Sequence, residues 1–202
     1  MPCNIAVYCG SSKRAGQAFL DQATAVGTAI GQRDHTLVWG AGSIGLMGAV
    51  ARATQSAGGK VIGVIPKAMD HVEITYQNCD ELIYTDTMRQ RKHIMDERSD
   101  VFVVLPGGFG TLDEFFEAMT LIQTMKIRPF PVICMDKNFW SGLTEWMQKT
   151  LDDEYQTISP GDLSRFHMTD DVGEAVAVIN RCFREQCSLG PDADGEAFPN
   201  FA

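Results

Sequence analysis

The sequence predicts an α/β domain built on a doubly wound, Rossmann-like parallel sheet. Short apolar segments rich in β-branched residues alternate with longer segments of helical periodicity. The apolar segments, such as residues 101–105 (VFVVL), lack polar alternation, as expected for strands that helices cover on both faces. A chain of 202 residues with 45% hydrophobic residues, no internal repeat and no Pro/Ser-rich linker favours one domain.

Six strands and six helices are expected, in alternation. The strands are residues 4–9, 36–39, 60–65, 81–85, 100–105 and 131–135. The helices are residues 16–33, 43–57, 87–98, 110–125, 140–152 and 171–185. The predicted domain covers residues 1–187, and the Gly-, Pro- and acid-rich residues 188–202 are expected to form a mobile tail or one docked on a partner subunit.

Composition excludes several classes of protein. The net charge of −9 argues against a general nucleic-acid or anionic-membrane binder. Because no apolar run approaches the roughly 20 residues of a membrane helix and the N-terminus lacks a secretion signal, we expect a cytoplasmic protein without membrane contact. The cysteines and histidines are scattered, so neither a disulfide scaffold nor a metal site is expected, and Cys9 and Cys134 are predicted to be buried thiols.

In such a fold the ligand binds outside the carboxyl ends of the strands, which directs attention to the loops there. After the first strand, Gly10, Ser11 and Ser12 fit either a phosphate cradle or a tight turn with a helix N-cap. After the second strand, Gly40, Gly42 and Gly45 make a GxGxxG pattern. It follows the wrong strand for a dinucleotide site, and the third strand ends without a ribose-binding acid, so a mononucleotide or phosphate loop is favoured over an NAD site.

The third and fourth loops carry charge. Glu73 lies near the predicted rim, where most glutamates are merely solvated. Arg89, Arg91 and Lys92 form a basic cluster at the start of a helix, with Arg89 and Lys92 on one face and Arg91 pointing elsewhere. The cluster fits either a solvated helix face or an anion site in which one arginine turns inward.

The fifth loop, PGGFGTLDE, is the most distinctive segment. Gly107, Gly108 and Gly110 follow a buried strand and open a helix, which suits a phosphate or oxyanion turn. Thr111 and Glu114 fit a capping box, a purely structural role. A carboxylate in a first helical turn is also held ionised by the helix dipole, which suits a base better than a proton donor.

These residues resemble the Lonely Guy family of cytokinin riboside 5′-monophosphate phosphoribohydrolases. The resemblance rests on PGGxGTxxE at 106–114, CGSS at 9–12, GSIGLMG at 42–48, GVIP at 63–66 and MRQRK at 88–92. Together the motifs cover about residues 3–150 in the family's order. Members were formerly labelled lysine decarboxylases, but no lysine here has an evident pyridoxal-phosphate setting.

The resemblance implies a homodimer of Rossmann-like subunits that hydrolyses a purine nucleoside 5′-monophosphate without a cofactor. Arg91 and Glu114 would form the catalytic pair. The other positions expected to contact substrate are Gly10, Ser11, Gly42, Gly45, Glu73, Lys92, Gly107, Gly108, Gly110, Thr111 and Thr120. Hydrolysis of the N-glycosidic bond would release free base and ribose 5-phosphate. A non-catalytic nucleotide or molybdenum-cofactor carrier on the same fold is the alternative, and such a binder does not need the Arg91–Glu114 pair.

The sequence departs from the family pattern at two positions. Ala41 replaces the middle residue of a glycine triplet and would add a methyl group where backbone meets ligand. Arg89 stands where histidine is common. Either change would shift substrate preference. A prenylated adenine would need an apolar slot, for which Phe115, Met119 and Met125 are candidates, although such spacing is more typical of core; AMP is the other candidate substrate.

Overall fold

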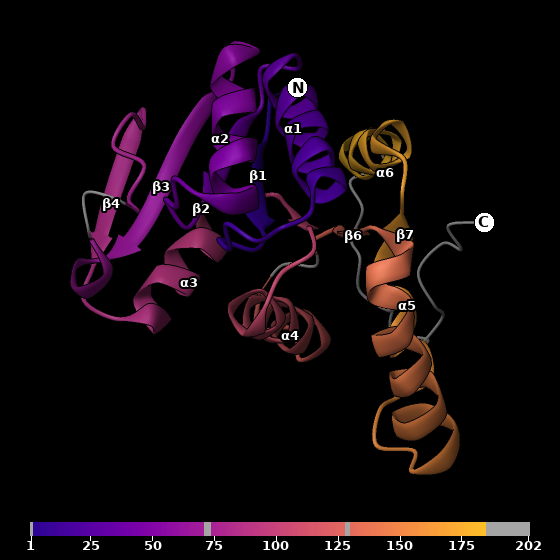
Figure 1. Ribbon diagram of the computed structural model, residues 1–202. Coiled ribbons are helices and arrows are strands. Elements are labelled where there is room, and N and C mark those ends of the chain that lie inside the picture. The colour runs from indigo at the N-terminus through magenta and orange to yellow at the C-terminus, as the bar shows by residue number, and fades with distance from the viewer. Residues whose placement is uncertain (1, 71–73, 128–129, 185–202) are drawn as a thin grey trace.

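Parallel strands form one sheet in the computed structural model, which describes residues 2–70, 74–127 and 130–184 (Figure 1). In these residues the strand order is β4-β3-β2-β1-β5-β6-β7, and every neighbouring pair is parallel. The order runs backwards from β4 to β1 and forwards from β5 to β7. It therefore reverses between β1 and β5, which is where open α/β sheets bind ligands.

The six expected strands are confirmed, with ends shifted by one residue at most. They are β1 (Asn4–Tyr8), β2 (Thr36–Trp39), β3 (Lys60–Pro66), β4 (Glu81–Thr85), β5 (Val101–Val104) and β6 (Val132–Met135). A short edge strand, β7 (His167–Thr169), was not predicted. Its three residues contain no apolar run, and they are extended because they pair with β6.

The six expected helices are also confirmed. They are α1 (Gln17–Gly31), α2 (Gly45–Ser56), α3 (Met88–Glu97), α4 (Phe109–Gln123), α5 (Lys137–Trp146) and α6 (Val172–Arg184). Helix α5 begins three residues earlier than predicted because the Asp136 side chain accepts a hydrogen bond from the Phe139 N–H at 2.8 Å. It continues as a π-helical segment, η2 (Met147–Glu154), and two 3₁₀ turns, η1 (Lys67–Met69) and η3 (Asp162–Arg165), complete the regular structure of the described residues.

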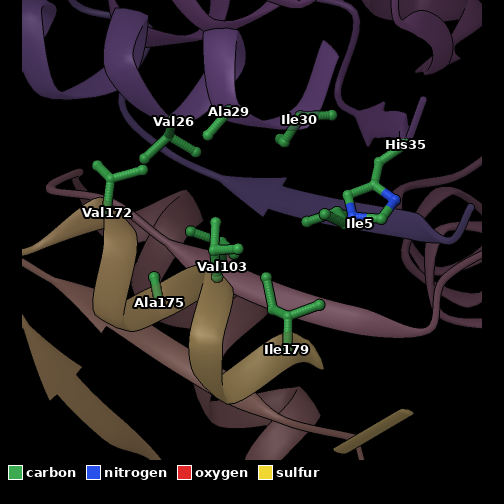
Figure 2. A pocket seen from close by; sticks show the side chains of 10 residues that line it. Ile5, Val26, Ala29, Ile30, His35, Val103, Val172, Ala175 and Ile179 are labelled. Carbon is green, nitrogen blue, oxygen red and sulfur yellow. The ribbon is translucent and has the colours of Figure 1, made fainter. Parts of the chain in front are cut away.

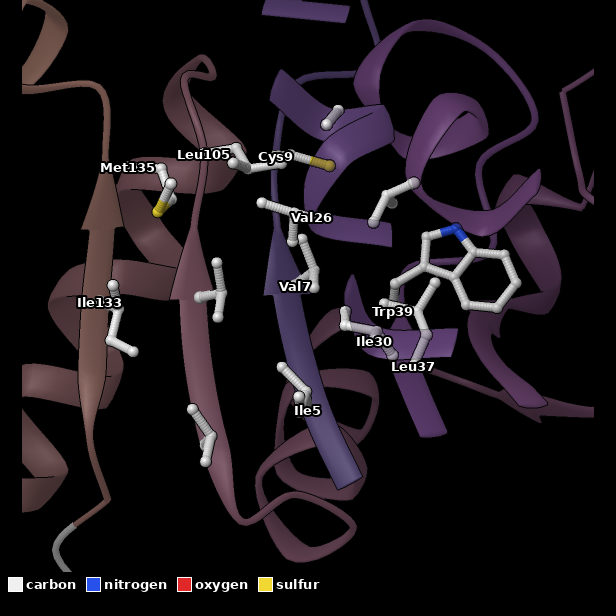
Figure 3. Close-up of a cluster of buried hydrophobic side chains, with 14 of the residues drawn as sticks. Ile5, Val7, Cys9, Val26, Ile30, Leu37, Trp39, Leu105, Ile133 and Met135 are labelled. Carbon is white, nitrogen blue, oxygen red and sulfur yellow. The ribbon is translucent and has the colours of Figure 1, made fainter. Parts of the chain in front are cut away.

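Helices cover both faces of the sheet, so the core has two layers. Helices α1, α2 and α6 lie on one face, and α3, α4 and α5 lie on the other (Figure 1). Successive strand residues alternate between the two layers: Val103 belongs to the first cluster and Phe102 to the second. Figure 3 shows the first cluster, where strand side chains meet Val26 and Ile30 of α1. Cys9 and Cys134 are buried thiols, as predicted.

A small apolar cavity of about 20 Å³ lies between α1, α6, β1 and β5, with His35 at one side (Figure 2). The His35 ring is buried, and its Nδ1 accepts a hydrogen bond from the Cys3 backbone N–H at 3.1 Å. Burial lowers the pKa of His35 below its ordinary value of 6.5. The ring is therefore a neutral packing element that holds the start of β1.

No helix among the described residues is both long enough and apolar enough to span a membrane. The predicted boundary at residues 187 and 188, and with it the predicted tail, lies outside the described residues.

Candidate active site

A cavity of about 400 Å³ opens at the carboxyl ends of β1, β2, β3 and β5. This is the edge of the sheet that the strand order selects for a ligand. Eight of the predicted site residues line it: Gly10, Ser11, Gly42, Arg91, Gly108, Gly110, Thr111 and Glu114. The other lining residues are Cys9, Ser12, Gly40, Ile44, Met47, Ile65, Met69, Ile74 and Met88.

Arg91 turns inward from α3, as the functional interpretation of the basic cluster requires. Arg91 is 7% exposed, and its Nε donates a hydrogen bond to the Val64 carbonyl at 3.1 Å. Nη1 contacts the Met88 sulfur at 3.7 Å, and Nη2 lies 3.7 Å from Oε1 of Glu114. The guanidinium is thus fixed from the protein side while it lines the cavity.

Glu114 is a buried carboxyl in the cavity wall, and its residue is 8% exposed. Burial raises the pKa of Glu114 from 4.5 to about 7, although the positive charge of Arg91 pulls the pKa down. A group with this pKa exchanges protons readily at neutral pH, which is what a general acid or base needs.

The expected capping box is wrong, and so is the helix-dipole argument for Glu114. Helix α4 begins at Phe109 with Gly108 as its N-cap, so Thr111 is already the third helical residue. Glu114 lies in the second turn, beyond the range in which the dipole acts strongly. Its protonation is therefore governed by burial and by Arg91, and it is not held ionised.

The amino-terminal end of α4 lies in the wall of the cavity. No side chain of the described residues caps this helix. The first N–H groups of a helix have no intrahelical partners, and Gly108, Gly110 and Thr111 at this helix start line the cavity. Methyl groups on Gly108 or Gly110 would touch no described atom within 4 Å, which leaves the space above the turn for a ligand. Gly107 is different: a methyl there would overlap the Thr111 side chain.

The first and second loops meet at the opposite wall. Gly10, Ser11 and Ser12 line the cavity, and because α1 starts at Gln17 after an N-cap at Gly16, neither serine caps a helix. The N–H groups of Leu46 and Met47 both donate to the Gly10 carbonyl, at 3.0 and 3.4 Å. These two N–H groups at the start of α2 are therefore used within the protein, and the phosphate contacts expected of Gly42 and Gly45 stay predictions.

Gly45 does not line the cavity, and local structure explains why this residue is glycine. Its φ is +60°, and a methyl there would lie 2.6 Å from the Ser11 carbonyl carbon. Ala41 does not line the cavity either. Ala41 is fully buried, and its Cβ lies 2.8 Å from where a methyl on Gly63 would sit. The expectation that this methyl meets the ligand is wrong.

An apolar wall completes the cavity, and it consists of Met47, Met69, Ile74 and Met88 together with Ile44 and Ile65. Met69, Ile74 and Met88 are 44%, 36% and 38% exposed, so they present apolar surface to the opening. None of the expected slot residues lines it: Phe115 is core, Met119 packs against that core, and Met125 is 78% exposed on the outside.

Three other expected contacts do not line the cavity: Gly107, Lys92 and Thr120. Lys92 pairs with two carboxylates of α4, Asp113 at 2.9 Å and Glu117, and so joins α3 to α4. Thr120 is exposed, and its hydroxyl donates to the Phe116 carbonyl of its own helix. Arg89 is exposed and does not line the cavity. Glu73 lies outside the described residues. The proposed substrate contacts of Lys92, Thr120 and Glu73 stay predictions.

A second buried acid stands close to this site and was not predicted. Asp96 of α3 is 7% exposed and accepts a hydrogen bond from the Tyr8 hydroxyl at 3.0 Å. Burial raises the pKa of Asp96 from 3.8 to about 6, while the Tyr8 hydrogen bond lowers it. The negative charge of Asp96 also raises the pKa of Glu114, so α3 supplies both a cation and an anion that tune the cavity acid.

Comparison with known proteins gives one consistent family. The family model described as "Possible lysine decarboxylase" matches residues 47–179. A Mycobacterium tuberculosis protein named cytokinin riboside 5′-monophosphate phosphoribohydrolase is 43% identical over 173 residues, which cover 85% of this chain and 90% of that protein. The Arabidopsis thaliana protein named cytokinin riboside 5′-monophosphate phosphoribohydrolase LOG2 is 36% identical over 152 residues, which cover 75% of this chain and 71% of that protein.

Solved structures share the fold at lower identity. The molybdenum cofactor binding protein of Rippkaea orientalis superposes with a TM-score of 0.69 at 20% identity, over 91% of this chain and 98% of that one. The molybdenum cofactor carrier protein of Chlamydomonas reinhardtii gives 0.68 at 23% identity, over 91% and 99%. These likenesses establish the Rossmann-like fold alone. The sequence matches decide the family, and the chain belongs to the Lonely Guy family of cytokinin riboside 5′-monophosphate phosphoribohydrolases.

Proposed function

We propose that this protein hydrolyses the N-glycosidic bond of a purine nucleoside 5′-monophosphate and releases free base and ribose 5-phosphate. The observation that carries the proposal is the Arg91–Glu114 pair, buried in the wall of a cavity that also receives the uncapped start of α4. A protein that only carries a nucleotide has no need of a proton-exchanging carboxyl there. The names of the 43% and 36% identical relatives support the same activity.

The proposed reaction breaks the bond between C1′ of the ribose and the base nitrogen. Water supplies a hydroxyl to C1′ and a proton to the departing base, so no cofactor is consumed. Positive charge develops on the ribose in the transition state, and the Glu114 carboxylate stabilises it and takes the proton from the attacking water. Because the pKa of Glu114 is about 7, both its charged and neutral forms are accessible near neutral pH, and the neutral form can return the proton.

Binding of the 5′-phosphate positions the reacting centre. We assign the phosphate to the N–H groups at Gly108, Gly110 and Thr111, because the positive end of α4 favours an anion. Contacts to this remote group hold C1′ near Glu114, so binding energy is used for orientation. Arg91 then either orients the ribose or assists the leaving base.

The apolar wall bears on the choice of base. Met69, Ile74 and Met88 offer partly exposed apolar surface, and an isopentenyl chain on adenine would bury itself against it. Burial of each CH₂ group contributes roughly 0.8 kcal/mol. We therefore propose that the enzyme accepts both AMP and the prenylated nucleotide and binds the prenylated one more tightly.

We further propose a cytoplasmic homodimer. Phe109 is 93% exposed at the start of α4, and Phe116, two turns later on the same face, is 39% exposed. An exposed aromatic pair of this kind is typical of a surface that meets another protein. The buried thiols of Cys9 and Cys134 fit a reducing compartment.

One substitution with a matched control tests the proposed activity. Glu114→Gln keeps the shape of the side chain but removes the charge, so turnover should fall by about 100-fold or more while nucleotide still binds. Glu145→Gln makes the same change at an exposed position of α5 that does not line the cavity, and it should leave turnover near the wild-type rate. Equal activity of Glu114→Gln and wild type would reject the proposed role of Glu114. Nucleotide binding by the wild-type protein without any product would favour the carrier function.

A further inference from the structure

We infer that Gly40 is a positioning residue for the reaction, because its missing side chain leaves the space in which the Arg91 guanidinium lies beside Glu114. The inference rests on the proposed roles of Arg91 and Glu114. It assigns to the first glycine of the loop after β2 a task that concerns an arginine, and not the ligand.

The contact is between two elements far apart in the sequence. Gly40 directly follows β2, and Arg91 reaches it from α3. A methyl group on Gly40 would overlap Nη2 of Arg91 outright and would lie 2.7 Å from its Cζ. It would also lie 2.6 Å from Cε of Met47, at the end of a flexible side chain. The guanidinium therefore fills the volume that any other residue at position 40 would need.

Backbone conformation does not explain this glycine. The described glycines with positive φ are Gly45, Gly58 and Gly161, so Gly40 has a backbone that other residues adopt without strain. Gly45 in the same loop is the contrasting case, since its φ of +60° alone favours glycine. At position 40 the requirement is purely steric, and the atom that imposes it belongs to the predicted catalytic arginine.

The contacts of Arg91 restrict the movement of its guanidinium. Its Nε is held by the Val64 carbonyl at 3.1 Å, and Nη2 is the nitrogen that faces Glu114 at 3.7 Å. A side chain at position 40 displaces that same nitrogen. The guanidinium must then give up its place beside Glu114, its bond to Val64, or both, although the end of an arginine side chain can move without unfolding the domain.

Gly42 provides a matched control in the same loop. It also lines the cavity, but a methyl there would lie 2.7 Å from Sδ and 3.1 Å from Cβ of Met47, and no Arg91 atom is among its three nearest neighbours. Gly40→Ala should therefore disturb Arg91, whereas Gly42→Ala should disturb Met47 and the apolar wall. The two variants differ in which side chain moves and not in the size of the group added.

The first experiment compares kcat, KM and the pH dependence of kcat for both variants with AMP as substrate. Misplacing a catalytic group by about 1 Å can cost on the order of 100-fold in rate, so kcat of Gly40→Ala should fall by about that factor. Because Arg91 lowers the pKa of Glu114, its displacement should also move the acid limb of the profile to higher pH. Gly42→Ala should raise KM and leave the acid limb in place. Equal losses of kcat in both variants, with the acid limb of the pH profile unshifted in both, would overturn the inference.

A double variant covers the case in which Gly40→Ala folds poorly. In an Arg91→Ala background the space beside Gly40 is empty, so Gly40→Ala should lower the melting temperature of the wild type and leave that of Arg91→Ala unchanged. The same drop in both backgrounds would overturn the inference. An Arg91→Ala protein with wild-type turnover would instead remove the catalytic role proposed for Arg91, while the melting temperatures would still decide the steric claim.

Discussion

The replacement Glu114→Gln should stabilise the protein above neutral pH while it lowers turnover by about 100-fold or more. Burial raises the pKa of Glu114 from 4.5 to about 7 in the folded protein, and unfolding returns the group to its ordinary value. Below pH 4.5 the carboxyl is protonated in both states, and it costs nothing. Between pH 4.5 and the folded pKa, the unfolded state has lost the proton that the folded state still holds, so stability falls as the pH rises. The full cost is present once the pH exceeds the folded pKa. The two pKa values differ by an amount equivalent to about 3 kcal/mol, since one pKa unit is about 1.4 kcal/mol.

The assay is urea unfolding of wild type and Glu114→Gln at a series of pH values between 4 and 8.5. The free energies of unfolding should be similar at the acid end, and the variant should exceed wild type by about 3 kcal/mol at the alkaline end. Glu145→Gln, which makes the same change at an exposed carboxylate of α5, should follow wild type throughout. A difference that stays constant with pH, or that favours wild type at pH 8, would refute the account of Glu114 as a buried, costly acid.

Further predictions concern other parts of the molecule. Gly110→Ala should keep the stability of the protein or raise it by up to about 1 kcal/mol in calorimetry, because alanine favours helix and its methyl meets no described atom within 4 Å. Nucleotide affinity should nevertheless fall in titration. Unchanged affinity would argue against a phosphate at this position. Gly107→Ala should lose stability instead, because its methyl would overlap a side chain of α4. Protonation of His35 removes the acceptor for the Cys3 N–H. Because burial lowers the pKa of His35, the stability that the neutral ring contributes is present above pH 6.5 and is lost on acidification. His35→Gln should flatten that acid loss in urea unfolding, and an equal loss in the variant would exclude His35 as its source. Phe109→Asp should shift the sedimentation of a wild-type dimer to that of a monomer, and an unchanged dimer would move the interface elsewhere.

Much of the fold was predictable because each element satisfies local rules. Buried strands such as β5 (Val101–Val104) are continuous apolar runs, and the loops that follow them are rich in glycine. The edge strand β7 escaped prediction since its three residues owe their extended form to pairing with β6. Helix α4 starts earlier than the capping-box pattern indicates, and only the three-dimensional start at Phe109 shows that Glu114 lies in the second turn.

The candidate site was predictable where a residue stands in the loop that follows a strand or near the start of the helix after it. Arg91 and Glu114 were assigned from the resemblance, and the structure brings them to 3.7 Å. An apolar slot was expected on helix α4, whereas the apolar wall of the cavity includes Met47, Met69 and Met88 from segments after β2, β3 and β4. The rule that places ligands at strand ends contained that information. No local signal could have shown that Gly40 makes room for an arginine 51 positions along the chain, because that contact exists only in the folded protein.

The most direct test of the proposed activity is to incubate purified protein with AMP, isopentenyladenosine 5′-monophosphate, GMP, CMP and unphosphorylated adenosine, and to separate the products by chromatography. Release of free base and ribose 5-phosphate from the phosphorylated purines, with none from adenosine, is the predicted result. Faster release from the prenylated nucleotide than from AMP at low concentration would support the apolar wall as its binding surface. Absence of base from every nucleotide, with nucleotide still bound, would contradict the hydrolase and leave a carrier.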